Sequence, residues 1–148
     1  MRIVDKIIMK ADADHVYHIA ANVEQWPEYF PLYRWVEVQE RSPTGAIVEI
    51  AARRGWIPVK WTAVQLCDEE NREVFFRHIE GATRGMAVIW RIIPTDDGVC
   101  LEVIHELTMQ RRIIGSPIGR FLIGWGFVKN ITRRTLQQMK SVAESNQK

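Results

Sequence analysis

The chain has 148 residues, a formal net charge of +2 and a hydrophobic content of 47%, values typical of one soluble globular domain. We therefore expect residues 1–148 to form a single domain with no nucleic-acid partner, since the overall charge supplies little attraction to one. No apolar run is long enough to span a bilayer and no signal peptide is evident, so a cytoplasmic location is expected. The two cysteines, Cys67 and Cys100, lack metal-type spacing and suit a reduced protein.

The first thirty residues predict one strand and two short helices. Residues 2–9 are rich in β-branched side chains, which indicates a strand. Asp12 is a suitable N-cap for a short helix over 13–20. Pro27 interrupts a second short helix or tight turn over 24–30.

The middle of the chain alternates apolar and polar residues in short segments separated by turn residues. This pattern predicts antiparallel strands joined in chain order by tight turns. The expected strands cover residues 34–41, 46–53, 56–67, 73–79, 86–94 and 99–109. Together with the N-terminal strand they predict a sheet of about six or seven strands.

The last part of the chain predicts one long helix over 115–144. Ser116 and Pro117 suit its N-cap and first turn. Apolar or small residues then recur at three- and four-residue steps: Ile118, Leu122, Trp125, Val128, Thr132, Thr135, Met139 and Val142. Such a stripe must pack on the sheet, so we predict an α+β fold in which a curved antiparallel sheet wraps around the C-terminal helix. Contact on one side of the helix leaves an interior space for a ligand.

Aromatic and polar side chains fall near the expected interior space or its mouth. The tryptophans are Trp26, Trp56, Trp61 and Trp90, and the polar residues are Tyr33, Gln65, His78 and His105. They either fill a small core or line a flat slot for a planar or extended apolar ligand. Buried polar groups need partners, so several of them on one apolar surface favour a binding site.

Sequence motifs for other chemistries are absent. The chain has no zinc-protease helix motif, no paired cysteine ligands, no nucleophile elbow and no phosphate-binding glycine loop. His15 and His18 are three residues apart but have no carboxylate or cysteine partner at suitable spacing. We therefore expect neither a metal site nor a cofactor.

Basic residues dominate the C-terminal part of the chain. From residue 109 onward eight lysines and arginines stand against the single acid Glu144. This stripe is either a solvated helix face or a surface for an acidic partner or anionic lipid headgroups.

The segment 23–30, Val-Glu-Gln-Trp-Pro-Glu-Tyr-Phe, followed by Tyr33, resembles the segment after the first helix in bacterial polyketide aromatase/cyclases. The similarity continues through residues 78–80, 86–90 and 103–109 and through the last helix. These proteins belong to the helix-grip (SRPBCC) superfamily, which also includes START lipid carriers, pollen-allergen-like proteins and coenzyme-Q-binding proteins. The resemblance implies the helix-grip fold and a cofactor-independent enzyme that closes and dehydrates a poly-β-ketone chain.

The resemblance also implies roles for individual residues. Tyr33 would donate or accept a proton, and His105 would be a second polar group, better suited as general base because an unperturbed imidazole has a pKa near 6.5. The substrate-binding residues would be Trp26, Phe30, Arg53, Trp61, His78, Met86, Trp90 and Thr135. Gln65 occupies the position where well-studied members carry a catalytic arginine. Either His105, His78 or Arg53 replaces that arginine, or the protein binds its ligand without catalysis.

Two functions therefore remain open. One is an aromatase/cyclase with Tyr33, His105 and Gln65 as catalytic residues. The other is a carrier or chaperone for a lipid or quinone, while a third alternative is an interaction protein with a filled core. The basic residues expected to meet an acyl carrier protein or an anionic membrane surface are Arg120, Lys129, Arg133 and Arg134.

Overall fold

The computed structural model describes residues 2–54, 56–81, 83–107 and 125–145. Strand β1 (Arg2–Met9) is followed by helix α1 (Ala13–Ala21), a 3₁₀ turn (Val23–Gln25) and the short helix α2 (Trp26–Tyr29). The remaining elements are β2 (Tyr33–Ser42), β3 (Gly45–Arg54), β4 (Ile57–Asp68), β5 (Glu73–Gly81), β6 (Met86–Thr95), β7 (Gly98–Leu107) and α5 (Trp125–Ser145). All seven strands form one antiparallel sheet in the order β1-β7-β6-β5-β4-β3-β2.

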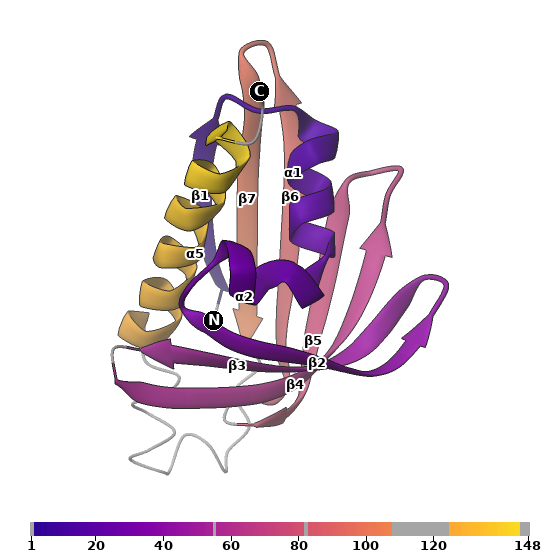
Figure 1. The fold of residues 1–148 in the computed structure, drawn as a ribbon, viewed down its shortest axis with the longest axis vertical. Coiled ribbons are helices and arrows are strands. Elements are labelled where there is room, and N and C mark those ends of the chain that lie inside the picture. Colours follow the sequence, from indigo (N-terminus) through magenta and orange to yellow (C-terminus); the bar gives the residue numbers. More distant parts are fainter. Residues whose placement is uncertain (1, 55, 82, 108–124, 146–148) are drawn as a thin grey trace.

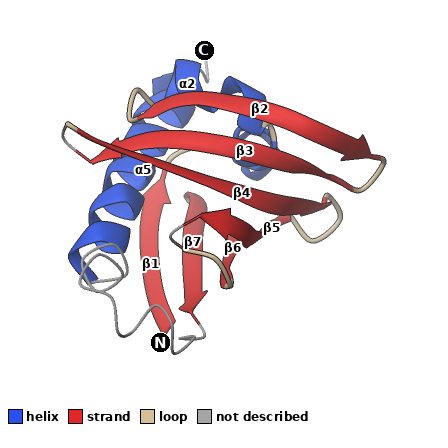
Figure 2. Ribbon diagram, turned by 90° about the horizontal axis from the view of Figure 1, so that it is seen from below, coloured by secondary structure: helices blue, strands red, loops and turns tan. Residues whose placement is uncertain are grey.

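The helices lie on one side of this curved sheet, and the sheet wraps around α5 (Figures 1 and 2). Helix α5 contacts β1 at one edge of the sheet and β3 near the other, while α1 lies over β5 and β6. The predicted α+β helix-grip architecture is therefore confirmed. No helix within the described ranges is both long and apolar enough to cross a membrane.

The inner face of α5 follows the predicted stripe where the structure describes it. Thr132, Thr135 and Met139 are buried, and Leu136 and Ala143 extend the same face. The predicted positions Ser116, Pro117, Ile118 and Leu122, and the side chains of Trp125 and Val128, lie outside the described residues. At the far end of the helix, the Glu144 carboxylate accepts a hydrogen bond of 3.0 Å from the backbone N–H of Lys10, which ties α5 to the chain beyond β1.

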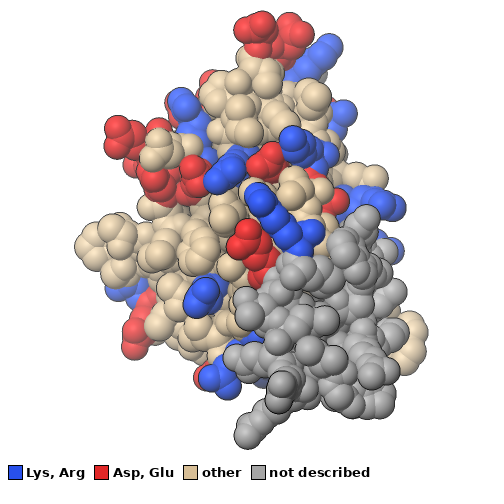
Figure 3. All heavy atoms as spheres, turned by 180° about the vertical axis from the view of Figure 1, so that it is seen from behind, with Lys and Arg blue, Asp and Glu red and all other residues tan. Residues whose placement is uncertain are grey.

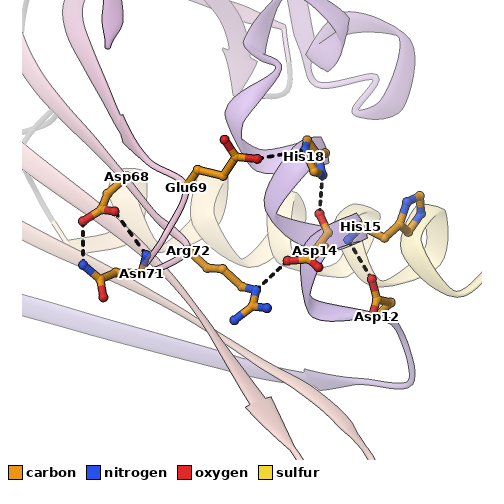
Figure 4. A network of polar contacts seen from close by, with 8 residues as sticks. All are labelled: Asp12, Asp14, His15, His18, Asp68, Glu69, Asn71 and Arg72. Atoms are coloured by element: carbon orange, nitrogen blue, oxygen red, sulfur yellow. Dashed lines mark hydrogen bonds and ion pairs between the residues drawn. The ribbon is translucent and has the colours of Figure 1, made fainter.

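Helix α1 is held to the turn between β4 and β5 by a polar cluster (Figure 4). Asp12 caps the helix as predicted, because its carboxylate accepts from the His15 N–H at 3.3 Å. Asp14 accepts a 2.8 Å hydrogen bond from Nε of Arg72, which stands in that turn with a left-handed φ of 52°. The cluster fixes α1 across the concave face and so helps to set the depth of the interior.

The carbonyls at the C-terminal end of α1 are satisfied by side chains from elsewhere. A helix leaves its last carbonyls without helical partners. Trp26 donates its indole N–H to Ile19 O at 3.1 Å, and Gln65 donates its amide N–H to Ala21 O at 2.8 Å. Pro27 sits at the start of α2, where its missing N–H is tolerated, so the chain turns sharply and the Trp26 ring is directed inward.

The outer face of the sheet carries a row of opposite charges in cross-strand register. Lys6 on β1 pairs with Glu102 on β7 at 3.3 Å, and Arg91 on β6 lies 3.7 Å from both Glu102 and Glu73. Viewed from behind, positive and negative side chains are interspersed on this face (Figure 3). Such a surface is well solvated and has no strong preference for an anionic partner.

Candidate functional site

A cavity lies between the concave face of the sheet and α5. Its described walls are mostly apolar, and its polar lining residues are Tyr33, His78, Thr83, His105, Thr132 and Thr135. These side chains come from β2, β5, the turn after β5, β7 and α5, segments far apart in the sequence that the wrapped sheet brings together. The cavity measures about 70 Å³, so a ligand that needs the usual 300–1,000 Å³ must displace some of the lining side chains.

Trp26 forms the aromatic end of the cavity. Its ring contacts those of Tyr33, Trp90 and Phe76 at centroid distances of 5.0, 5.2 and 5.6 Å. Phe30, expected among the substrate-binding residues, does not line the cavity. It is fully buried and packs against the rings of Trp26 and Tyr33, at centroid distances of 5.8 and 6.1 Å, on their side away from the cavity.

The Tyr33 hydroxyl has a defined orientation. It lies 3.2 Å from Thr135 Oγ1, and Thr135 in turn donates its proton to Ile131 O at 2.8 Å. Because the threonine proton is used in this way, Tyr33 is the donor in the Tyr33–Thr135 bond. Burial raises the pKa of Tyr33 to about 12, so the phenol is protonated at pH 7.

His78 is fixed on two sides. Its ring stacks on Trp61 with centroids 5.4 Å apart and planes 5° from parallel, and its Nδ1 lies 2.6 Å from the Thr83 hydroxyl. Burial, with a smaller contribution from nearby His105, lowers the pKa of His78 to about 3. The turn that carries Thr83 is close to Trp61 because Gly81, with a φ of 105°, packs against the β4 backbone where a Cβ atom would lie 2.8 Å from Lys60 O.

His105 is held more loosely. Its Nε2 is 3.5 Å from the Thr132 hydroxyl, and its buried Nδ1 has no hydrogen-bond partner within the described part of the protein. Burial lowers the pKa of His105 to about 4, well below the value near 6.5 on which the sequence analysis relied. The imidazole is therefore neutral at pH 7 and is a weaker base than expected.

Gln65 and Arg53 do not line the cavity. Gln65 is on the concave face as expected, but it lies four residues along β4 from Trp61, roughly 13 Å in a strand, and its amide caps α1. Arg53 is exposed, because it neighbours the inward-facing Ala52 and successive strand residues point to opposite faces. The structure therefore brings neither Gln65 nor Arg53, both expected in the site, to the described wall of the cavity.

The remaining predicted residues divide clearly. Trp61, Met86, Trp90 and Thr135 line the cavity with Trp26, Tyr33, His78 and His105. Trp56, in contrast, is 87% exposed and does not line it. Sequence reasoning did not single out Thr83 or Thr132 as site residues. Thr132 belongs to the predicted inner stripe of α5 and could have been found there, whereas no signal marks Thr83 within its turn.

No group of three or more histidine, cysteine, aspartate or glutamate side chains in the described ranges could hold a metal ion.

Of the four basic residues expected at a partner surface, Arg133 and Arg134 are exposed on α5. Arg120 and the side chain of Lys129 lie outside the described residues.

Comparison with known proteins gives a family match over most of the chain. Residues 9–139 match the family model described as polyketide cyclase/dehydrase and lipid transport. The actinorhodin polyketide synthase bifunctional cyclase/dehydratase of Streptomyces coelicolor is 29% identical over 107 residues, which cover 71% of this chain and 34% of that protein. The chain thus spans about a third of the length of this relative.

Solved structures share the fold. An aromatase/cyclase, Zhui, from a Streptomyces species superposes with a TM-score of 0.83 at 18% identity, covering 100% of this chain and 96% of that one. A START superfamily protein from Mycobacterium smegmatis gives a TM-score of 0.73 at 12% identity, with 97% of each chain covered. At these identities the likeness concerns the fold.

Proposed function

Because the chain belongs to the family of polyketide cyclases, dehydrases and lipid-transport proteins, we propose that it binds a polyketide-like chain in the cavity and promotes regiospecific aldol cyclisation and dehydration. The observation that carries the proposal is the convergence of Tyr33, His78 and His105 on one mostly apolar cavity. A proton donor, a proton acceptor and a shaped slot are the requirements of an aldol closure. The cyclase/dehydratase name of the Streptomyces coelicolor relative supports the same reaction class.

Carbon–carbon bond formation comes first in the proposed reaction. A methylene between two carbonyls loses a proton to the neutral imidazole of His105. The resulting enolate carbon bonds to a second carbonyl carbon of the same chain, and the new alkoxide takes up a proton from the imidazolium. The apolar walls hold the chain folded for one of the available closures, because an extended ketone chain otherwise has several.

Dehydration follows at the new hydroxyl. His105 accepts the neighbouring carbon-bound proton. Tyr33 turns its O–H from Thr135 to the leaving hydroxyl and donates the phenol proton to it, so that one water is lost and a double bond forms. The tyrosinate then recovers its proton from the imidazolium. The raised pKa of Tyr33 keeps this donor protonated, and the lowered pKa of His105 keeps the acceptor unprotonated at pH 7.

Gln65 has no part in the proposed reaction, since its amide is bound to the end of α1. Stabilisation of an enolate oxygen would come from neutral donors, the His78 imidazole and the Thr132 hydroxyl. A neutral donor contributes less than an arginine. We therefore expect a slower catalyst whose main contribution is to select one closure.

The experiment is a product analysis with a reactive poly-β-ketone thioester. Tyr33→Phe and His105→Ala are each expected to lower formation of the dehydrated ring about 10²-fold or more, the usual contribution of a positioned acid or base. Tyr29→Phe and His18→Ala are matched controls, since neither residue lines the cavity. If the cavity variants form product as fast as these controls, the proposed roles are wrong.

A carrier of lipid or quinone would use the same apolar cavity without chemistry. Native mass spectrometry followed by denaturing extraction separates the two functions. An empty protein that turns over the ketone supports the cyclase, and a stoichiometric lipid or quinone with no turnover would replace it by the carrier.

An acyl carrier protein that delivers the chain would meet the exposed Arg133 and Arg134, since basic side chains attract an acidic partner. An anionic membrane surface would be met in the same way.

A cytoplasmic location is part of the proposal and is supported by the two free cysteines, Cys67 and Cys100.

A further inference from the structure

The cavity has no charged group among its described lining residues. Aspartate, glutamate, lysine and arginine are all missing from that part of its wall. Its titratable side chains are Tyr33, His78 and His105, and burial shifts each pKa in the direction that favours the neutral form. A ligand carboxylate placed there would lose its hydration and meet no counter-charge, which is costly.

His78 is the most rigidly placed of the polar groups. The parallel Trp61 ring covers one face of the imidazole, and the 2.6 Å contact with Thr83 occupies Nδ1 and fixes the ring plane. A ligand would therefore meet the other ring nitrogen. A hydroxyl both donates and accepts, so it can pair with that nitrogen whichever ring nitrogen carries the proton. Little side-chain freedom remains to be lost on binding, which strengthens such a contact.

His105 is held less firmly than His78, and one of its ring nitrogens lacks a partner. Its hydroxyl partner is at 3.5 Å, the outer limit of a hydrogen bond, and its buried Nδ1 has no partner in the part of the chain that the structure describes. A buried nitrogen without a partner is unfavourable. His105 therefore offers a ligand a less firmly placed partner than His78 does.

We infer that the cavity selects a ligand that is uncharged at its buried end and carries a hydroxyl or enol oxygen, and that His78, positioned by Trp61 and Thr83, is the residue that selects it. The inference rests on the proposed function and narrows it. The substrate would enter as an ester- or thioester-linked chain, and the free carboxylic acid of the same chain would be rejected. Thr83 is a positioning residue in this arrangement.

The test uses three single-ring probes of similar shape at pH 7.5: phenol, toluene and benzoate. Their dissociation constants are measured by isothermal titration or by ligand-observed NMR. We expect phenol to bind at least as tightly as toluene, and benzoate to bind at least about tenfold more weakly than either, because an unpaired buried charge is disfavoured more than an unpaired hydroxyl. Benzoate binding as tightly as phenol would overturn the inference.

Variants assign the selection to a residue. His78→Phe keeps the aromatic stack and is expected to weaken phenol about tenfold while toluene changes less than about twofold, which also reports an intact cavity. His18→Phe, on the surface, is the matched control. Thr83→Val should weaken the binding of phenol, and Thr83→Ser, which keeps the hydroxyl, should bind phenol as the wild type does. If His105→Phe abolishes phenol selectivity and His78→Phe does not, the assignment to His78 is wrong.

These measurements need no turnover, so they are independent of the proposed reaction. If the protein selects phenol through His78 but leaves a poly-β-ketone unchanged, the inference is supported and the proposed function is contradicted. If the protein cyclises the ketone but binds benzoate as tightly as phenol, the proposed function is supported and the inference is contradicted.

Discussion

The Tyr33 hydroxyl donates a 3.2 Å hydrogen bond to Thr135 Oγ1, and this bond joins the edge strand β2 to the inner face of α5. The two residues are 102 positions apart in the chain. Because no strand among the described residues pairs with the outer side of β2, this contact helps to close the interior at that edge of the sheet. The same hydroxyl is the proposed proton donor, so one side chain serves both the fold and the reaction.

Replacing Tyr33 by Phe is therefore expected to cost stability as well as activity. The buried Thr135 oxygen loses its donor, and such a loss typically costs about 1 kcal/mol. Urea unfolding monitored by circular dichroism measures the change in the free energy of unfolding. Tyr29→Phe is the comparison, and equal stability of the two variants would show that the Tyr33–Thr135 bond contributes nothing.

The two buried histidines predict a specific dependence of stability on pH. Their pKa values are about 3 for His78 and about 4 for His105 in the folded protein, against about 6.5 in an unfolded chain. The unfolded state therefore binds more protons below pH 6.5, and the free energy of unfolding should fall as the pH drops from about 6.5 to about 4.

The slope approaches about 1.4 kcal/mol per pH unit for each histidine that titrates only on unfolding. Urea titrations between pH 7 and pH 4 measure it. The double variant His78→Phe with His105→Phe should have a visibly flatter profile than the wild type. Parallel profiles for the two proteins would mean that these imidazoles are not held neutral by burial.

Gln65 is expected to act on stability and not on catalysis. Gln65→Leu keeps the volume of the side chain but leaves Ala21 O without its donor, which should lower the free energy of unfolding by about 1–2 kcal/mol. Product formation per folded molecule should stay within about threefold of the wild type. A loss comparable to that of His105→Ala would return Gln65 to the catalytic residues.

The basic face of α5 predicts a salt-dependent partner. Arg133→Glu with Arg134→Glu should weaken binding of an acidic acyl carrier protein about tenfold or more at low salt, and less at high salt, because exposed charges are screened. Arg77→Glu, on the outer face of β5, is a matched control. Co-sedimentation with anionic vesicles tests the membrane alternative. If the two charge-reversal proteins bind the acyl carrier protein equally well, this face of α5 is not its docking surface.

The order of elements and the inward faces of the strands could be predicted from the sequence, because each depends on local alternation and turn residues. His78, His105, Trp61 and Trp90 were found for that reason, whereas Trp26 and Tyr33 precede the predicted strand over 34–41 and were singled out by the resemblance to a known family. The position of a residue along its strand, and therefore its neighbours on other elements, was harder to predict. Gln65 shares a face with Trp61 but lies far enough along β4 to meet α1, and only the tertiary arrangement shows this.

Three further features depend on the whole fold. Trp56 suggested a cavity wall because of its side-chain type, yet its place beyond β3 leaves it exposed. The neutral state of His105 also could not be foreseen, since burial and the distance to other charges set its pKa. Thr83 is a site residue only because the turn after β5 returns its hydroxyl to His78.

The most direct test of the central claim is the product distribution from a poly-β-ketone thioester incubated with and without the wild-type protein. Chromatography with mass spectrometry would resolve the ring-closure isomers and their dehydrated forms. The proposed cyclase should enrich one dehydrated isomer at least about tenfold over the spontaneous mixture, a preference of about 1.4 kcal/mol between competing transition states. A distribution identical to that of the protein-free control would contradict the account.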